Sequence, residues 1–120
     1  DDEEDDVFPA ILAAAESPAR RAQAFELVSS LLEDHCRMAE LWTALRVALG
    51  ALGNGIALPF PELTARRFLD LCRRHLEREE RELADLARQI PAARLRQVAG
   101  SIAQRHAGAD DCCPRRGRTP

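Results

Sequence analysis

The 120-residue sequence contains no tyrosine, and aromatic residues make up only 4% of it. Sandwiches, barrels and RNA-stacking sheets depend on aromatic and β-branched residues, so this scarcity argues against them. Lysine is absent too, all 17 basic residues are arginine, and the net charge is −3. Binding to nucleic-acid phosphates needs a basic face, so we expect no nucleic-acid partner.

Long apolar runs are also missing, because arginine, glycine and asparagine interrupt the most apolar stretch, residues 41–58. We therefore expect no membrane span. The first six residues are all acidic, the opposite of the positively charged start of a signal peptide. The four cysteines form no CxxC pair. These features favour a cytoplasmic protein with reduced thiols.

Good helix formers dominate what is present, namely alanine, leucine, glutamate and arginine. With 46% hydrophobic and 31% charged residues, the chain can bury a core beneath a heavily charged surface. Its length fits one domain. We predict an all-α fold, an antiparallel up-and-down helical bundle over residues 1–107, followed by a disordered tail over 108–120 where periodicity is lost.

Apolar residues spaced three and four apart predict four helices. The first runs from the start to Ala15. Ser17 followed by Pro18 is a typical helix start, and this second helix should end near Leu52, before two glycines. The third covers residues 62–89, and a short fourth follows Pro91 to about His106. The predicted buried positions of the two long helices are Phe25, Val28, Leu31, Leu32, Met38, Leu41, Trp42, Leu45, Leu49, Leu63, Phe68, Leu71, Cys72, Leu76, Leu83 and Leu86.

Polar side chains fall among these apolar positions. At 1.5 Å per residue, His35 and His75 both lie roughly 21–26 Å from the turn that joins their helices. The same count across the preceding turn places Glu3 in this layer, and Glu79 shares the face of His75. Buried carboxylates need a partner or a metal, and imidazole with carboxylate suits iron, manganese and zinc.

A simpler interpretation stays open, in which the histidines are hydrogen-bonded within the bundle and the glutamates face solvent. The third helix also carries charged residues that we assign to a solvent-exposed face with i,i+4 ion pairs. These residues are Arg73, Arg74, Glu77, Arg78, Glu80, Arg81 and Glu82. No Ser-His-Asp or Cys-His-Asn arrangement is supported. The residues therefore favour binding over catalysis.

Three segments resemble motifs of the hemerythrin-like, or HHE cation-binding, family. Residues 3–9, EEDDVFP, resemble its E-E-x-x-L-F-P signature, with valine in place of leucine. Residues 33–35, EDH, resemble its E-H motif, with Asp34 in place of the second glutamate. Residues 75–83, HLEREEREL, resemble its H-x-x-x-E-E-x-x-L motif. The similarity extends from residue 1 to about His106.

The resemblance implies a four-helix bundle holding two non-haem irons bridged by carboxylates. Glu3 and Glu79 would be the bridging ligands, and His35 and His75 terminal ligands. The implied function is to bind or sense dioxygen or a related small oxidant, such as nitric oxide or peroxide. The donor set leaves manganese or zinc open.

The family's first helix, the start of its second, and the histidines they carry have no counterpart here. We therefore expect the last three helices of such a bundle, with an open apolar face covered by a second copy in a homodimer or by N-terminal helices. The alternative function is a metal-free, degenerate helical bundle that acts as a protein interaction module.

Overall fold

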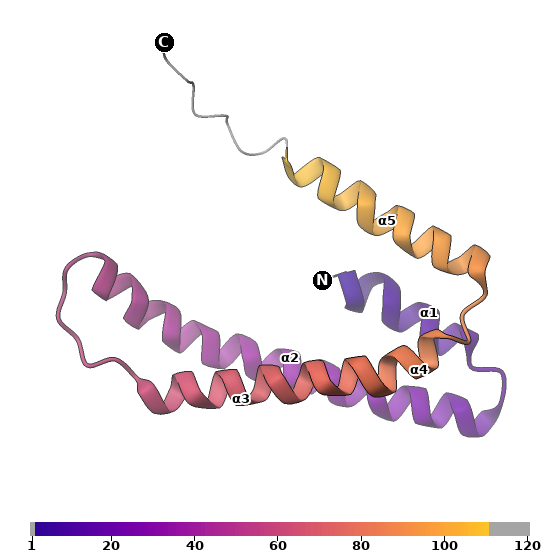
Figure 1. The fold of residues 1–120 in the computed structure, drawn as a ribbon, viewed down its shortest axis with the longest axis horizontal. Helices are drawn as coiled ribbons and strands as arrows, with labels where there is room; N and C mark the ends of the chain where they lie inside the picture. Colours follow the sequence, from indigo (N-terminus) through magenta and orange to yellow (C-terminus); the bar gives the residue numbers. More distant parts are fainter. Residues whose placement is uncertain (1, 111–120) are drawn as a thin grey trace, which may run out of the picture.

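The described part of the chain consists of helices joined by turns and loops, as expected. The structure, a computed structural model, describes residues 2–110 and contains no strand over that range. The all-α prediction is therefore confirmed (Figure 1). The elements are η1 (Glu3–Val7), α1 (Phe8–Ala14), α2 (Pro18–Gly53), α3 (Glu62–Arg78), η2 (Glu79–Leu83), α4 (Ala84–Ala87) and α5 (Ala92–Asp110), where η marks a π-helical turn.

The ends of α2 follow from local chemistry. The Ser17 hydroxyl accepts a hydrogen bond from the backbone N–H of Arg20 at 3.2 Å, and Pro18 occupies the first turn. At the other end Gly55 has φ +75°, a conformation that glycine adopts at little cost. Both boundary signals in the sequence are thus confirmed.

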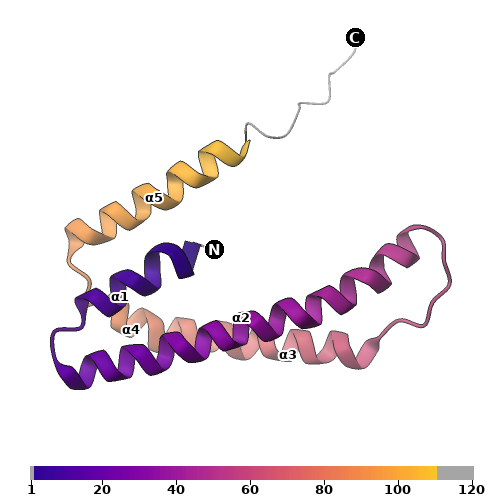
Figure 2. The same cartoon turned by 180° about the vertical axis from the view of Figure 1, so that it is seen from behind.

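The helices run up and down, as predicted. Helices α2 and α3 lie side by side and antiparallel, while η1 and α1 pack against the first half of α2 (Figures 1 and 2). After α4 the chain turns, and α5 contacts η1. It continues to Asp110, beyond the expected end of the bundle at 107. Positions 111–120 of the expected tail lie outside the described residues.

Charged groups join α5 to η1. The Arg105 guanidinium lies 2.9 Å from an Asp2 carboxylate oxygen and also pairs with Asp6. His106 Nε2 lies 2.7 Å from the other Asp2 oxygen, although the His106 side chain is exposed. Hydrogen bonds from His106 and Arg105 lower the pKa of Asp2. The docking of α5 thus depends partly on exposed ion pairs.

The core lies at one end of the molecule, where η1, α1, the first half of α2, and α4 meet. Ala24 and Leu31 are fully buried there. The buried apolar cluster consists of Phe8, Ala10, Ile11, Ala15, Ala24, Leu27, Val28, Leu31, Leu83, Leu86 and Ile90. We call this end the covered half.

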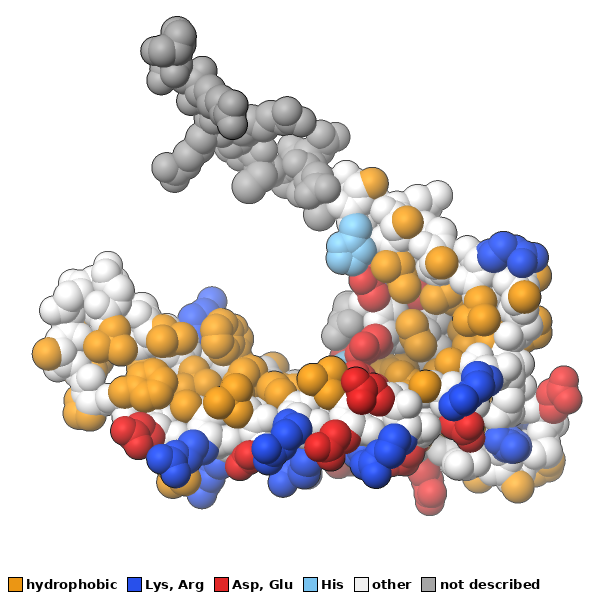
Figure 3. Space-filling view, in the orientation of Figure 1, with side chains coloured by type: hydrophobic (Ala, Val, Ile, Leu, Met, Phe, Trp, Pro, Cys, Tyr) orange, Lys and Arg blue, Asp and Glu red, His pale blue; other side chains and the backbone are white. Residues whose placement is uncertain are grey.

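The second half of α2, the first half of α3 and the loop between them form the open half. Only Leu45 and Leu71 are buried apolar residues there. Figure 3 shows hydrophobic side chains gathered along the side of this region that faces α5. The radius of gyration is 19.0 Å, whereas a compact chain of 100 residues has about 13 Å. The described helices therefore leave an apolar face without a cover.

Two causes explain the predicted core positions that are exposed. Phe25, Leu32 and Leu76 are 63%, 38% and 56% exposed. Each lies about 100° around its helix from a buried neighbour, which is Ala24, Leu31 or His75 respectively. Their assignment to the buried stripe was wrong. Residues of the open half have the right helical phase, but no described segment outside the α2–α3 pair covers them; these are Trp42, Leu49 and Leu63.

No helix among the described residues combines the length and the apolar character needed to cross a bilayer.

Candidate metal centre

The four polar residues singled out by helix arithmetic come together where the covered half ends. Glu3 comes from η1, His35 from the middle of α2, His75 from the last turn of α3, and Glu79 from the start of η2. One donor atom from each lies within 4.8 Å of all the others. The predicted common layer is therefore present, while the role of these residues as ligands stays a prediction.

Nitrogen and oxygen atoms crowd together in this cluster. The Nε2 atoms of His35 and His75 are 3.0 Å apart. His75 Nε2 is 2.7 Å from Glu79 Oε1, and His35 Nε2 is 3.5 Å from Glu3 Oε2. The simpler interpretation placed hydrogen-bonded histidines beside glutamates that face solvent. Both histidines do have hydrogen-bond partners, but Glu79 does not face solvent, since its side chain is only 15% exposed.

Burial makes the arrangement costly without a cation. His75 is 5% exposed. Glu79 Oε1 is buried without a hydrogen-bond partner, although it lies close to His75 Nε2. Burial raises the pKa of Glu3. The negative charge of Glu79, a hydrogen bond with Glu79 and the negative charge of Glu4 raise this pKa further, whereas the nearby His35 lowers it. A cation among these atoms would offset the repulsion and satisfy the orphaned oxygen, so the residues fit a metal ion.

Both carboxylate residues begin a widened helical turn. The carbonyl of Glu3 accepts from the N–H of Phe8, and the carbonyl of Glu79 accepts from the N–H of Ala84, both with i→i+5 spacing. In η1 the turn is followed by Pro9, which has no N–H to donate and whose ring crowds the carbonyl four residues earlier. Such π-helical turns inside α-helices are frequent at functional sites.

Glu4 and Asp34 were not predicted to take part. Glu4 Oε1 lies 2.6 Å from His35 Nδ1. Asp34 is 9% exposed, and its carboxylate lies 3.6 Å from His75 Nδ1. The buried spacing of α2, from Leu27 through Leu31, continues to Asp34, and that signal was available in the sequence.

Arg78 corrects another expectation. We assigned it to the solvated face, yet it reaches across to α2 and donates to Ser30 at 2.9 Å and to Asp34 at 3.2 Å. Its side chain is only 27% exposed. Arg78 lies three residues after His75 and so shares the inward face of α3. Its pair with Glu82, at 3.7 Å, does follow the predicted i,i+4 pattern.

The facing sides of α2 and α3 are apolar where they continue from the cluster into the open half. Met38 Sδ and Cys72 Sγ are 3.4 Å apart, one turn from the histidines, and the rings of Trp42 and Phe68 meet at 5.9 Å between centroids. On the other side, the Phe8 ring stacks on His35 at 6.1 Å. Cys112 and Cys113, the other sulfur donors in the sequence, lie outside the described residues.

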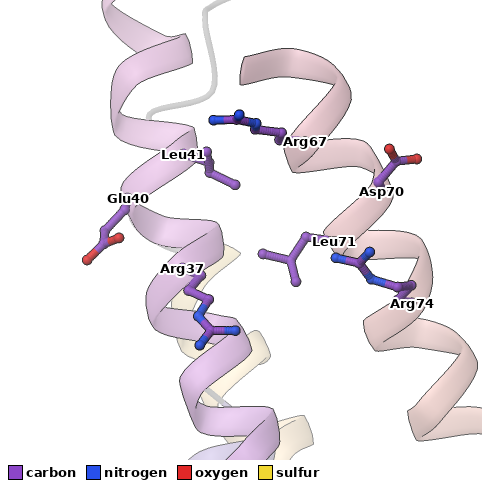
Figure 4. Close-up of a pocket in the computed structure, with 7 residues that line it drawn as sticks. All are labelled: Arg37, Glu40, Leu41, Arg67, Asp70, Leu71 and Arg74. Carbon is purple, nitrogen blue, oxygen red and sulfur yellow. The ribbon is translucent and has the colours of Figure 1, made fainter. Parts of the chain in front are cut away.

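A groove of about 350 Å³ between α2 and α3 lies apart from this cluster. Figure 4 shows the side chains of Arg67, Leu71 and Arg74 reaching from α3 toward α2, while Glu40 points away. None of the four clustered residues lines the groove. It therefore does not provide access to the candidate metal centre.

Comparison with known proteins bears on the whole arrangement. A family model described as the hemerythrin HHE cation-binding domain matches residues 1–87. This span includes all four clustered residues and ends at the last residue of α4. Searches of curated proteins and of solved structures give no match.

Proposed function

The chain belongs to the hemerythrin HHE cation-binding family, and on that premise we propose that it binds iron as a non-haem di-iron protein. In this proposal Glu3 and Glu79 would serve as the bridging ligands, and His35 and His75 would serve as terminal ligands. The site binds or senses dioxygen or a related small oxidant, such as nitric oxide or peroxide. The two cysteines described, Cys36 and Cys72, are free thiols, in keeping with a cytoplasmic protein.

One observation supports metal binding most directly. Four donor atoms from three segments far apart in sequence lie within 4.8 Å of one another. One of them, Glu79 Oε1, is buried without a hydrogen-bond partner. Two imidazoles and two carboxylates are a donor set for iron, manganese or zinc, and helical bundles build dinuclear sites from such residues.

The chain's own residues have distinct tasks in this site. The two carboxylates supply negative charge to neutralise the cations, while the imidazoles hold them from opposite helices. Phe8 stacks on His35 and, with the apolar residues above the cluster, limits water at the imidazoles. Bound iron supplies the redox chemistry and the open coordination positions that small oxidants need.

Metal content per chain, measured by mass spectrometry after expression in iron-supplemented medium, tests the proposal. Two irons per chain, with near-ultraviolet charge-transfer absorption that responds to dioxygen or nitric oxide, is the expected result. Manganese or zinc in place of iron would keep the site and overturn the metal identity. A folded chain without metal would overturn the site.

Variants make the test specific. His75→Ala and Glu79→Gln should lose metal because each removes a donor. Glu77→Gln is the matched control, since Glu77 is an exposed acid on the same helix outside the cluster. Equal metal content in all three variants would show that the metal binds elsewhere.

The open half supports a second candidate function, a metal-free helical module that binds another protein. Large apolar side chains are exposed there, including Trp42, Val47 and Phe60. A surface of this kind is characteristic of interaction sites. This candidate predicts a metal-free chain whose self-association or partner binding is lost on Trp42→Ala and unaffected by His75→Ala.

A further inference from the structure

The two histidines of the cluster are oriented in the same way. Their Nε2 atoms face each other at 3.0 Å, so each Nδ1 points away from the cluster. Each Nδ1 faces a carboxylate that is not one of the four clustered residues. For His35 this is Glu4, at 2.6 Å, and for His75 it is Asp34, at 3.6 Å.

Asp34 is held in place from α3. Arg78 Nη1 lies 3.2 Å from Asp34 Oδ2, and the same nitrogen donates to Ser30 Oγ at 2.9 Å. The Asp34 side chain is 12% exposed, so this ion pair is largely shielded from water. Its position is therefore fixed by a cross-helix contact at the level of the cluster.

His75 Nδ1 has a polar neighbour but no hydrogen bond. The atom is buried without a partner, and its 3.6 Å separation from Asp34 Oδ2 is longer than a hydrogen bond. A buried ring N–H without an acceptor is costly. A small rotation of the imidazole toward Asp34 would close this gap and leave Nε2 directed at the cluster.

We propose that Glu4 and Asp34 are positioning residues for the metal centre. Each accepts a hydrogen bond from the Nδ1–H of one histidine and so leaves Nε2 deprotonated for the metal, while Arg78 orients Asp34. Carboxylates behind metal-bound histidines fix the tautomer and raise ligand basicity. This inference rests on the proposed function, because it assigns a role to residues around the same site.

Metal affinity is the first test, with zinc as the probe because it accepts the same donors and is diamagnetic. Asp34→Asn and Glu4→Gln should each weaken zinc binding by about 10- to 100-fold, the usual effect of removing such a partner. Glu33→Gln is the matched control, since Glu33 is exposed and its one ion pair among the described residues is with Arg37, at 3.8 Å. Asp34→Glu should restore much of the affinity.

The tautomer is the second test, read from nitrogen-15 NMR of the imidazoles in the zinc-bound chain. In the wild type both histidines should carry the proton on Nδ1. In Asp34→Asn a neutral amide replaces the carboxylate whose Oδ2 faces both Arg78 Nη1 and His75 Nδ1. Loss of this negative charge weakens the preference for a proton on Nδ1 and should raise the share of the Nε2–H tautomer of His75. A purely structural role for Asp34 would change stability without changing the tautomer.

The outcomes separate this inference from the proposed function. A wild-type chain that binds neither iron nor zinc overturns the proposed function. A wild-type chain that binds metal, with Asp34→Asn and Glu4→Gln matching Glu33→Gln in affinity and tautomer, overturns the inference alone. If Asp34→Asn fails to fold, Glu4→Gln decides, because the Glu4 side chain is 39% exposed and its loss leaves the core intact.

Discussion

The covered and open halves of the α2–α3 pair are built from similar helices and differ in what packs on them. In the covered half Leu31 is completely buried, within a cluster to which α1, α2, η2 and α4 contribute. In the open half Trp42 and Phe68 contact each other across the pair, yet Trp42 remains 46% exposed. Packing partners, rather than helical periodicity, therefore decide which apolar positions form a core.

The candidate metal centre lies at the boundary between the two halves. His35 belongs to α2 and His75 to α3, whereas Glu3 belongs to η1, which lies at the edge of the covered half. The site is thus assembled by the packing of η1 against the pair. Substitutions that affect one half but not the other test whether packing at this boundary governs both stability and metal binding.

The largest contrast is expected from one substitution made in each half. Leu31→Ala removes a fully buried side chain and should lower the free energy of unfolding by about 3 kcal/mol, within the range for buried leucines. Leu69→Ala removes a 65% exposed leucine from α3 and should change it by less than about 0.5 kcal/mol. Urea unfolding followed by circular dichroism measures both. Equal losses would show that the open half is packed in solution.

Bound metal should stabilise the covered half by a comparable amount. A ligand that binds only the folded state adds about 2.7 kcal/mol when its free concentration is 100 times its dissociation constant. Adding a chelator should therefore lower the melting temperature of the wild type, but not that of His75→Ala. A chelator effect of the same size in both would place the metal outside the cluster.

The sequence predicted the four clustered residues because helical rise is regular. Counting residues from two turns suffices to place Glu3, His35 and His75 in one layer. Family resemblance independently indicated the same positions, and the family match covers them. The depth of a residue along a bundle is therefore accessible from sequence whenever the turns are clearly marked, as they are by Ser17 and Gly55.

The surroundings of the site were less predictable, since they depend on contacts between helices. The sequence around Arg78 shows alternating charges, which are typical of a solvated helix face. Only the approach of α2 gives Arg78 its partners Ser30 and Asp34. Pro9 follows the π-helical turn in η1, but no proline directly follows the π-helical turn that begins at Glu79, so the sequence gives no signal for the second turn. Exposure of Trp42 likewise depends on which helices cover it.

Removal of a helix cap should produce a smaller effect. Ser17→Ala deletes the hydroxyl that accepts from the Arg20 N–H and should lower the free energy of unfolding by about 1 kcal/mol. The cap lies at the turn between α1 and α2, so metal affinity should change only slightly. Paired urea unfolding and zinc titration measure the two effects. A large loss of zinc affinity would show that the entry to α2 controls the position of η1 at the site.

The smallest effect should come from screening the contacts of α5. The pairs of Arg105 and His106 with Asp2 are exposed, so added salt weakens them, whereas the apolar cluster of the covered half is insensitive to screening. Raising sodium chloride from 0.05 to about 0.5 M should therefore increase amide exchange in the second half of α5, with little change around Leu31. Arg105→Gln should reproduce this increase at low salt. If exchange in α5 stayed constant under both changes, its contact with η1 would depend on apolar packing, and the covered half would extend onto α5.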